Sequence, residues 1–178
     1  MATKIHVTKA ASLALPAFDA MAKRLADAGV ALTVLPSTDL YLMGRHHKHD
    51  HNVTRGVVPA HKLLHHGVNC SLSSNNILNP FTPFGDCSLI RMANMHANVL
   101  QVGQPDLLAD LFSMISDRSA RLLNLKDYGI KVGSEAEVTV IDARSPAEAV
   151  AINAPVLAVF KRGRQTVSRP RPELLRPR

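Results

Sequence analysis

Three apolar runs typical of strands, each followed by a segment typical of a helix, constrain the fold of this chain most. "KIHVT" (Lys4–Thr8) alternates as a short strand does, and "VALTVLP" (Val30–Pro36) is a continuous apolar run bounded by proline. "VNCSLSS" (Val68–Ser74) is the third run. Strand and helix that alternate at intervals of about 30 to 40 residues are typical of βα units around a parallel sheet.

Proline and glycine mark the expected helix boundaries between these runs. Proline favours the first turn of a helix, and glycine favours its end. The polar, histidine-rich stretch from Ser37 to about Val57 is expected to be a loop. Helices are expected over about Pro16–Gly29, Pro59–Gly67, Asp86–Val102 and Pro105–Asn124.

The pattern changes after Asn124, where short strands are expected to follow one another. The segments Glu137–Asp142, Val156–Gly163 and Arg164–Val167 are typical of antiparallel strands, with a hairpin turn at Gly163. We therefore predict an α/β domain over residues 1–128, strands of a small β-domain over 129–168, and a basic Arg/Pro-rich tail over 169–178.

Composition places the chain among globular proteins of one-domain size. It has 178 residues, of which 46% are hydrophobic and 20% charged. No apolar run reaches the roughly 18 residues needed to span a bilayer, so no membrane association is expected. The two cysteines, Cys70 and Cys87, do not make a disulfide framework and are expected to be core thiols. A cytoplasmic location follows as the default expectation.

The net charge of +7 is concentrated at one end of the sequence. Seven of the 21 basic residues lie between Lys161 and Arg178, where Glu173 is the one acidic residue. The rest of the chain is nearly balanced in charge. A solvated tail explains this distribution better than a nucleic-acid interface does, so binding of nucleic acid is the less favoured hypothesis.

Histidines form the other conspicuous group of residues. "GRHHKHDHN" (Gly44–Asn52) could bind a metal, but no strand or helix pattern flanks it to fix the ligands, so a solvent-exposed loop is favoured. His61 and His65 have the i,i+4 spacing of a chelating pair, yet surface histidines are the simpler interpretation. His6 lies inside a short apolar strand and is expected to be packed or hydrogen-bonded.

Four stretches taken together resemble the amidohydrolase superfamily, most closely its cytosine-deaminase-like branch. The most specific is "SARLLNLKDYGIKVGSEAEVTVID" (Ser119–Asp142), which is similar to the passage from the barrel of these enzymes into their small β-domain. Leu35–Arg45, Arg55–Cys70 and Asn79–Met95 resemble preceding barrel elements in order and spacing. The resemblance covers nearly the whole chain.

The resemblance implies part of a (β/α)₈ TIM barrel, about strands six to eight with their helices, followed by C-terminal strands of a small β-sandwich. Such enzymes hydrolyse non-peptide C–N bonds of cyclic amidines and amides with a water activated by a divalent metal, zinc or iron. His6 matches the family's sixth-strand histidine. Asn75 matches its metal-binding aspartate, and Asn76 matches a neighbouring carboxylate. His6, Asn75 and Asn76 are therefore the candidate catalytic positions, in degenerate form, and His6 and Asn75 the candidate metal ligands.

Asparagine carries no negative charge and cannot act as a general base. We also expect the family's first five strands, with their histidine ligands, to be absent. We therefore favour the C-terminal portion of a deaminase-like amidohydrolase that is inactive alone and does not retain the metal. One alternative is an active hydrolase assembled with a separate N-terminal half-barrel. The other is a non-catalytic metal- or nucleic-acid-binding protein. Exposed sheet edges also make self-association an expectation.

Overall fold

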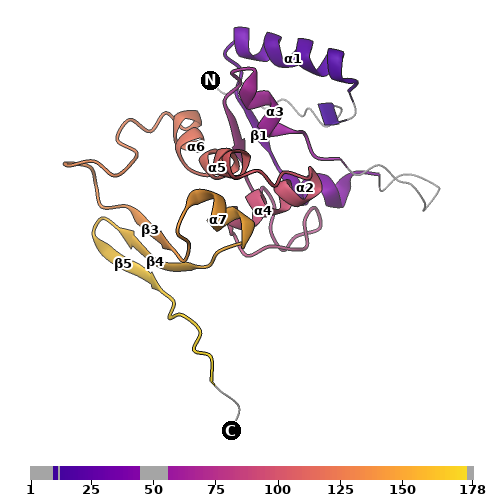
Figure 1. The fold of residues 1–178 in the computed structure, drawn as a ribbon. Helices are drawn as coiled ribbons and strands as arrows, with labels where there is room; N and C mark the ends of the chain where they lie inside the picture. The colour runs from indigo at the N-terminus through magenta and orange to yellow at the C-terminus, as the bar shows by residue number, and fades with distance from the viewer. Residues whose placement is uncertain (1–9, 12, 45–55, 176–178) are drawn as a thin grey trace.

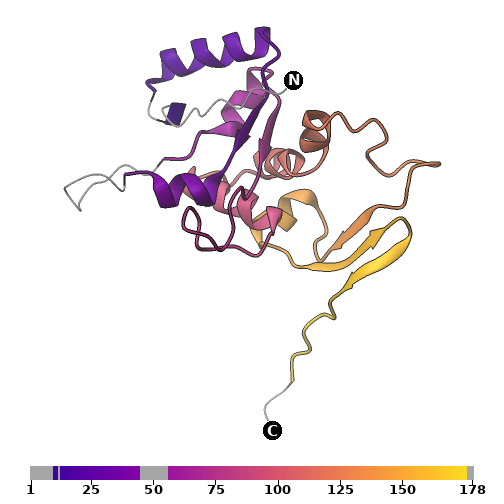
Figure 2. The same cartoon turned by 180° about the vertical axis from the view of Figure 1, so that it is seen from behind.

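The computed structural model describes residues 10–11, 13–44 and 56–175, and it has an α/β fold. Helix α1 and the three-stranded sheet β3–β5 lie at opposite ends of the molecule, with α4, α5 and α7 between them (Figures 1 and 2). The elements are α1 (Leu15–Asp27), β1 (Leu32–Val34), α2 (Pro36–Leu42), α3 (Ala60–His65), β2 (Cys70–Leu72), α4 (Leu89–Val99), α5 (Pro105–Met114), α6 (Asp117–Leu122), β3 (Val138–Ile141), α7 (Pro146–Ala151), β4 (Val156–Lys161) and β5 (Arg164–Ser168).

β1 and β2 pair in parallel, in the register Leu32–Cys70, Thr33–Ser71 and Val34–Leu72. All three residues of β2 are buried, as the apolar run predicted. The hydroxyls of Thr33 and Ser71 face each other at 2.8 Å, which satisfies two polar groups inside this pair. The expected strand Lys4–Thr8 lies outside the described residues.

The main core is aliphatic and lies where the helices meet the parallel pair. Leu63 of α3, Leu111 of α5 and Val150 of α7 are completely buried in it. α5 is central because it contacts α3, α4, α6, α7 and β2. Burial of such side chains contributes about 1.5–3 kcal/mol each, which is the main source of stability for the fold.

The second sheet has the order β3-β4-β5. β4 pairs antiparallel with both of its neighbours, which confirms the predicted antiparallel strands. The hairpin turn between β4 and β5 consists of Arg162 and Gly163, whose φ values are +49° and +74°. Positive φ at both positions matches the right-handed twist of the strands. Every residue of β5 is exposed, so this edge of the sheet faces solvent.

Three features of the helices differ from the sequence expectations. The stretch that begins at Ser37 is helical as far as Leu42, not a loop. The helix expected over Pro105–Asn124 is two helices, because the hydroxyls of Ser113 and Ser116 donate to the carbonyls of Asp110 and Phe112 and compete with helix continuation. The short helix α7 was not expected, and the Ser145 hydroxyl caps it by accepting from Glu148 N–H.

No helix among the described residues is long and apolar enough to cross a membrane. The division into residues 1–128, 129–168 and 169–178 stays a prediction.

Candidate functional site

The carboxyl ends of β1 and β2 lie side by side, because Val34 and Leu72 are register partners. After β1 the chain turns at Pro36 into α2, which places Ser37 and Thr38 at this edge. After β2 it continues through Ser74 into the loop that holds the asparagines. In parallel α/β folds, ligands bind outside the carboxyl ends of the strands. This edge is therefore the candidate site.

A buried pair of threonines fixes the two loops to each other. The hydroxyl oxygens of Thr38 and Thr82 are 2.7 Å apart, and Thr82 is completely buried. Thr38 also donates weakly to the carbonyl of Ser74 at 3.5 Å. The loop after β2 is thus tied to the start of α2.

Two of the asparagines in this loop have structural partners. The Nδ2 of Asn79 donates to the Oδ1 of Asn76 at 3.1 Å. The Oδ1 of Asn79 accepts from the backbone N–H groups of Phe81 and Thr82 at 3.0 and 3.1 Å. These bonds close the loop in the way asparagine side chains commonly close turns.

Asn75 is arranged differently from its neighbours. It is exposed, and its φ of +58° lies in the left-handed region that asparagine tolerates better than most residues. Its side chain makes no hydrogen bond with any residue that the structure describes. The amide of Asn75 is therefore presented to solvent at the carboxyl end of β2, while Asn76 is half-buried and bonded.

The candidate metal ligand His6 lies outside the described residues, as does the histidine-rich stretch after Gly44. Within residues 10–11, 13–44 and 56–175, no three His, Cys, Asp or Glu side chains lie close enough to hold a metal ion. Asn75 itself offers a neutral oxygen in place of a carboxylate. The residues described at this edge do not fit the divalent ion that the resemblance implies. The roles of His6, Asn75 and Asn76 stay predictions.

A small, open pocket with room for about one water molecule lies at the same edge. Its polar lining comes from Ser37, Ser74 and Asn76, and its apolar lining includes Phe84 and Met92. The ring of Phe84 meets Tyr41 edge to face, with centroids 5.5 Å apart.

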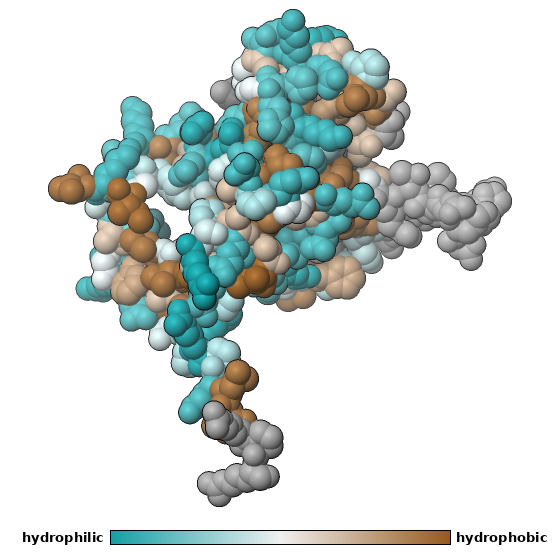
Figure 3. Space-filling model, viewed as in Figure 1, coloured by the Kyte–Doolittle hydropathy of each residue, from teal (hydrophilic) through white to brown (hydrophobic). Residues whose placement is uncertain are grey.

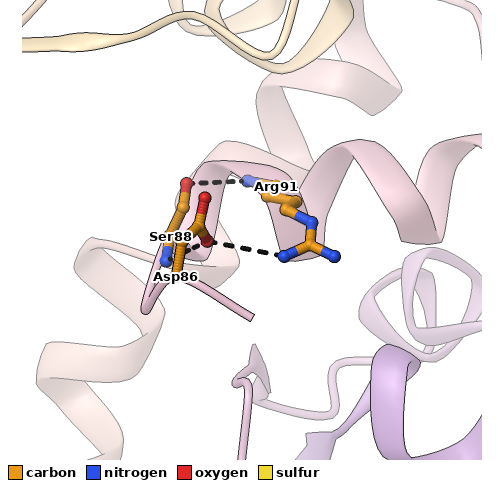
Figure 4. Close-up of polar contacts among 3 residues, drawn as sticks. All are labelled: Asp86, Ser88 and Arg91. Atoms are coloured by element: carbon orange, nitrogen blue, oxygen red, sulfur yellow. Dashed lines mark hydrogen bonds and ion pairs between the residues drawn. The ribbon is translucent and has the colours of Figure 1, made fainter. Parts of the chain in front are cut away.

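Asp86 is the one charged side chain that lines this pocket, and Arg91 lies beside it (Figure 4). Its Oδ1 accepts from the N–H of Ser88 at 3.0 Å and lies 3.6 Å from the guanidinium of Arg91. The hydroxyl of Ser88 in turn accepts from Arg91 N–H at 3.2 Å and caps α4. The Asp86 carboxylate stays 64% exposed, so Arg91 offsets its charge only in part.

A pair of buried imidazoles, His61 and His96, lies between α3 and α4, apart from this edge. The rings meet edge to face with centroids 5.8 Å apart, and the Nε2–H of His96 donates to the carbonyl of Val58 at 3.3 Å. Neither Nδ1 atom has a hydrogen-bond partner in the described part of the chain. Burial is the largest cause that lowers the pKa of both imidazoles, that of His96 to about 4.

The pair corrects the expectation of surface histidines on α3. His61 is only 7% exposed, whereas His65 is exposed, so the two do not share an environment suited to chelation. His96 was not singled out from the sequence. His96 lies three residues after Ala93 and one before Ala97, and both alanines are buried. This spacing places His96 on the buried face of α4, which was the available signal in the sequence.

The two cysteines are both free, but only one is a core thiol. Cys70 is buried in β2, and burial raises its pKa to about 12, so it is unreactive. Cys87 is exposed, contrary to expectation, because the turn before α4 places it at the surface with a φ of +64°.

Comparison with known proteins places this geometry in a family. The chain is 34% identical over 112 residues to the N-isopropylammelide isopropyl amidohydrolase of Pseudomonas sp. strain ADP, a match that covers 62% of this chain and 28% of that enzyme. The chain thus spans less than a third of the length of that curated relative.

Solved structures share the fold. A 5-methylcytosine deaminase from Klebsiella pneumoniae, liganded with 5-fluorocytosine, matches 96% of this chain and 41% of its own at a TM-score of 0.86 and 24% identity. An adenosine deaminase from Xanthomonas campestris, solved with bound zinc, matches 84% of this chain and 35% of its own at a TM-score of 0.63 and 18% identity.

The pattern of the amidohydrolase family matches residues 5–167, which is most of the sequence. It includes both the parallel pair with its asparagine loop and the antiparallel sheet. This chain belongs to the amidohydrolase family.

Proposed function

We propose that this chain forms the C-terminal part of a TIM-barrel amidohydrolase that hydrolyses carbon–nitrogen bonds of small nitrogen heterocycles, and that it is inactive alone. The observation that carries the proposal is the match of 96% of this chain to only 41% of a 5-methylcytosine deaminase. The relatives named above act on ring-borne nitrogen substituents, which supports the substrate class.

The chemistry of the described edge supports the second half of the proposal. A hydrolytic metal centre needs anionic or imidazole ligands held in place by neighbours. At the carboxyl end of β2 this chain has the neutral amides of Asn75 and Asn76, and Asn76 is already committed to Asn79. What these residues can do is accept and donate hydrogen bonds, so they can position a polar ring but cannot take its protons.

Metal retention by the purified, tag-free chain tests this proposal. After loading with zinc and dialysis against a weak chelator, we expect far less than one ion per chain by mass spectrometry, and no ammonia released from cytosine. The matched variant is Asn75→Asp, which restores one carboxylate at an exposed position. It is expected to retain no more zinc, because one added ligand does not complete a site. About one tightly held ion in either protein would contradict the incomplete centre.

The second candidate is an active hydrolase formed with a separate polypeptide that supplies the rest of the barrel. A specific observation favours it. The segment between α6 and β3 carries apolar side chains that are far more exposed than single chains usually leave them, namely Leu123, Leu125, Ile130 and Val132. Figure 3 shows apolar side chains gathered at the far end of this segment.

Ile130 is 94% exposed and Val132 completely so, which is costly in water unless another surface covers them.

Co-expression with a polypeptide that carries the His-x-His strand of the family tests this candidate. We expect a one-to-one complex by light scattering, with zinc-dependent ammonia release in the complex only. Ile130→Lys with Val132→Lys should abolish the complex, whereas Lys126→Ala in the same segment should not. A chain that stays monomeric and inactive beside that polypeptide would refute this candidate.

A further inference from the structure

The outer edge of the antiparallel sheet is open on β5. This strand has β4 as its neighbour on one side and no strand of the described chain on the other. Every residue of β5 is exposed, and the chain that follows it runs away from the sheet in Figures 1 and 2. Such an edge strand carries backbone groups with which another extended chain can pair.

The backbone of Ser168 provides these groups. The N–H of Arg169 donates to the carbonyl of Leu157 at 2.7 Å, so the backbone at Arg169 is turned toward β4. Inward and outward groups alternate along an antiparallel strand, and the N–H and C=O of Ser168 therefore point away from β4. The edge thus offers one donor and one acceptor to a further strand.

A β-bulge brings an arginine and a valine to one face of β5. Arg164 is the register partner of Lys161, and Val167 is that of Val159. Lys161 and Val159 are two residues apart on β4 and lie on one face, which their partners share. The spacing of three between Arg164 and Val167 would place them on opposite faces of a regular strand, and the register shift in this part of the hairpin prevents that.

Arg169 extends this row, because it follows Val167 by two residues. Both arginines of the row are exposed, and neither has an acidic partner among the described residues. The other cations of the hairpin and of the chain after it are paired, namely Lys161 with Glu137 at 3.3 Å, Arg162 with Glu135 at 3.5 Å and Arg171 with Asp142 at 2.7 Å. The row Arg164–Val167–Arg169 therefore presents two unpaired positive charges on either side of an apolar side chain.

We propose that the β5 edge binds an extended acidic peptide, which adds a strand to the sheet at Ser168 and places its carboxylates against Arg164 and Arg169. Strand addition to an open edge is a recurring mode of peptide recognition. Arginine suits it because a guanidinium can bind a carboxylate through two parallel hydrogen bonds. The chain already uses acidic residues in this way before β3, where Glu135 and Glu137 pair with basic residues of the hairpin.

Two other occupants match this edge less closely. A second copy paired β5 to β5 would bring the arginines of two edges together, and like charges on adjoining strands are destabilising. A single-stranded nucleic acid is usually held by aromatic side chains on which its bases stack, and this row has a valine between its arginines.

The register also sets the sequence of the matching peptide. On β4 the residues that face the row are spaced two apart, so a peptide strand needs Glu, Val and Glu at alternate positions. Thr-Glu-Thr-Val-Thr-Glu-Thr has this order. Glu-Thr-Thr-Val-Thr-Thr-Glu has the same composition and charge, but its glutamates lie on the opposite face from its valine, which makes it the matched control peptide.

Titration of the isotope-labelled chain with these peptides, followed by amide NMR, tests the proposal. For the first peptide we expect shifts confined to β5 and the residues next to it, with a Kd on the order of 0.1–1 mM. The control peptide should bind at least about tenfold more weakly, and added salt should weaken the binding of both.

Three variants separate strand addition from simple charge attraction. Arg164→Ala combined with Arg169→Ala should weaken binding about tenfold or more, whereas Arg24→Ala, an exposed arginine on α1, should leave the Kd within about twofold. Ser168→Pro removes the outward N–H without changing any charge, and it should abolish binding. Unchanged amide shifts outside β5 would show that each variant keeps the fold.

The proposal is overturned if the first peptide causes no shifts in β5 up to about 10 mM, well above the expected Kd. Equal binding of the two peptides, or wild-type binding by Ser168→Pro, would also overturn it. A twelve-nucleotide oligothymidylate that shifts β5 at lower concentration than the peptide would assign the edge to nucleic acid instead. None of these readouts involves a metal or the carboxyl ends of β1 and β2, so they are independent of the metal-retention experiment.

Discussion

Acidification is predicted to destabilise this fold through the buried imidazole of His96. His96 is completely buried on α4, and burial, followed by the charge of His61, lowers its pKa from 6.5 to about 4. The hydrogen bond to the Val58 carbonyl acts in the other direction but does not compensate. The groups whose charge acts on His61 are Lys62 and His65, both basic, so no carboxylate among them would stabilise an imidazolium in this pair.

The sign follows from which state binds the proton more tightly. The unfolded chain takes up a proton near pH 6.5, whereas the folded chain does so only near pH 4, so stability is complete above about pH 6.5 and falls as the pH drops toward 4. These two values imply a loss of about 2 kcal/mol at pH 5 and about 3 kcal/mol at pH 4 from His96 alone. Set against a total of about 5–15 kcal/mol for a typical domain, this is a large share.

Urea unfolding by circular dichroism at pH 7.5, 6, 5 and 4 measures this loss, with His96→Gln as the comparison. Glutamine keeps a donor for Val58 and does not titrate, so the difference in unfolding free energy between the two proteins should shrink by about 2 kcal/mol between pH 7.5 and 5. Leu123→Ala, an exposed position outside this pair, should keep the wild-type pH dependence. Two results would refute this prediction. One is a difference in unfolding free energy between wild type and His96→Gln that stays constant across this pH range. The other is a pKa of His96 above 6.5 measured by NMR.

Two further predictions concern packing and capping. Leu111→Ala should cost about 2–5 kcal/mol in unfolding free energy, because Leu111 is completely buried in α5, whereas Leu123→Ala, at 67% exposure, should change it by less than about 0.5 kcal/mol. A smaller loss for Leu111 would mean that the core around α5 can collapse into the cavity. Ser88→Ala should cost about 1 kcal/mol by removing the acceptor for Arg91 N–H, and Ser88→Asp should restore it. Equal stabilities of the alanine and aspartate variants in urea unfolding would show that this cap contributes nothing.

The apolar run predicted β2 because burial on both faces leaves a direct trace in sequence, whereas β1 leaves Thr33 exposed between the buried Leu32 and Val34. Cys70–Leu72 is buried throughout, and the positive φ of Gly163 lies where a hairpin turn needs it. α2 left no such trace, since the buried residues in it are Pro36, Ser37 and Thr38, whose burial depends on the neighbouring loop. Tertiary contacts rather than local hydrophobicity decide that helix.

α7 could have been predicted. Ser145 and Glu148 have the spacing of a capping box, with Pro146 in the first turn, and the hydroxyl of Ser145 does accept from Glu148 N–H. The pocket could not have been predicted in the same way. Ser37 and Ser74 are far apart in sequence, and only the parallel register of β1 and β2 brings them to one edge.

The amide of Asn79 is not interchangeable with a carboxylate. The bond between Asn76 and Asn79 needs an N–H donor on Asn79, and an aspartate there has none. Asn79 also holds the loop through the N–H groups of Phe81 and Thr82, and Thr82 carries the contact to Thr38. Carboxylates at both 76 and 79 would repel each other across the same 3.1 Å contact. The side chain of Asn75 makes no hydrogen bond with a described residue, so loop closure does not depend on it. The amide at 79 is therefore needed for loop closure, whereas the amide at 75 affects only what the edge offers to a ligand.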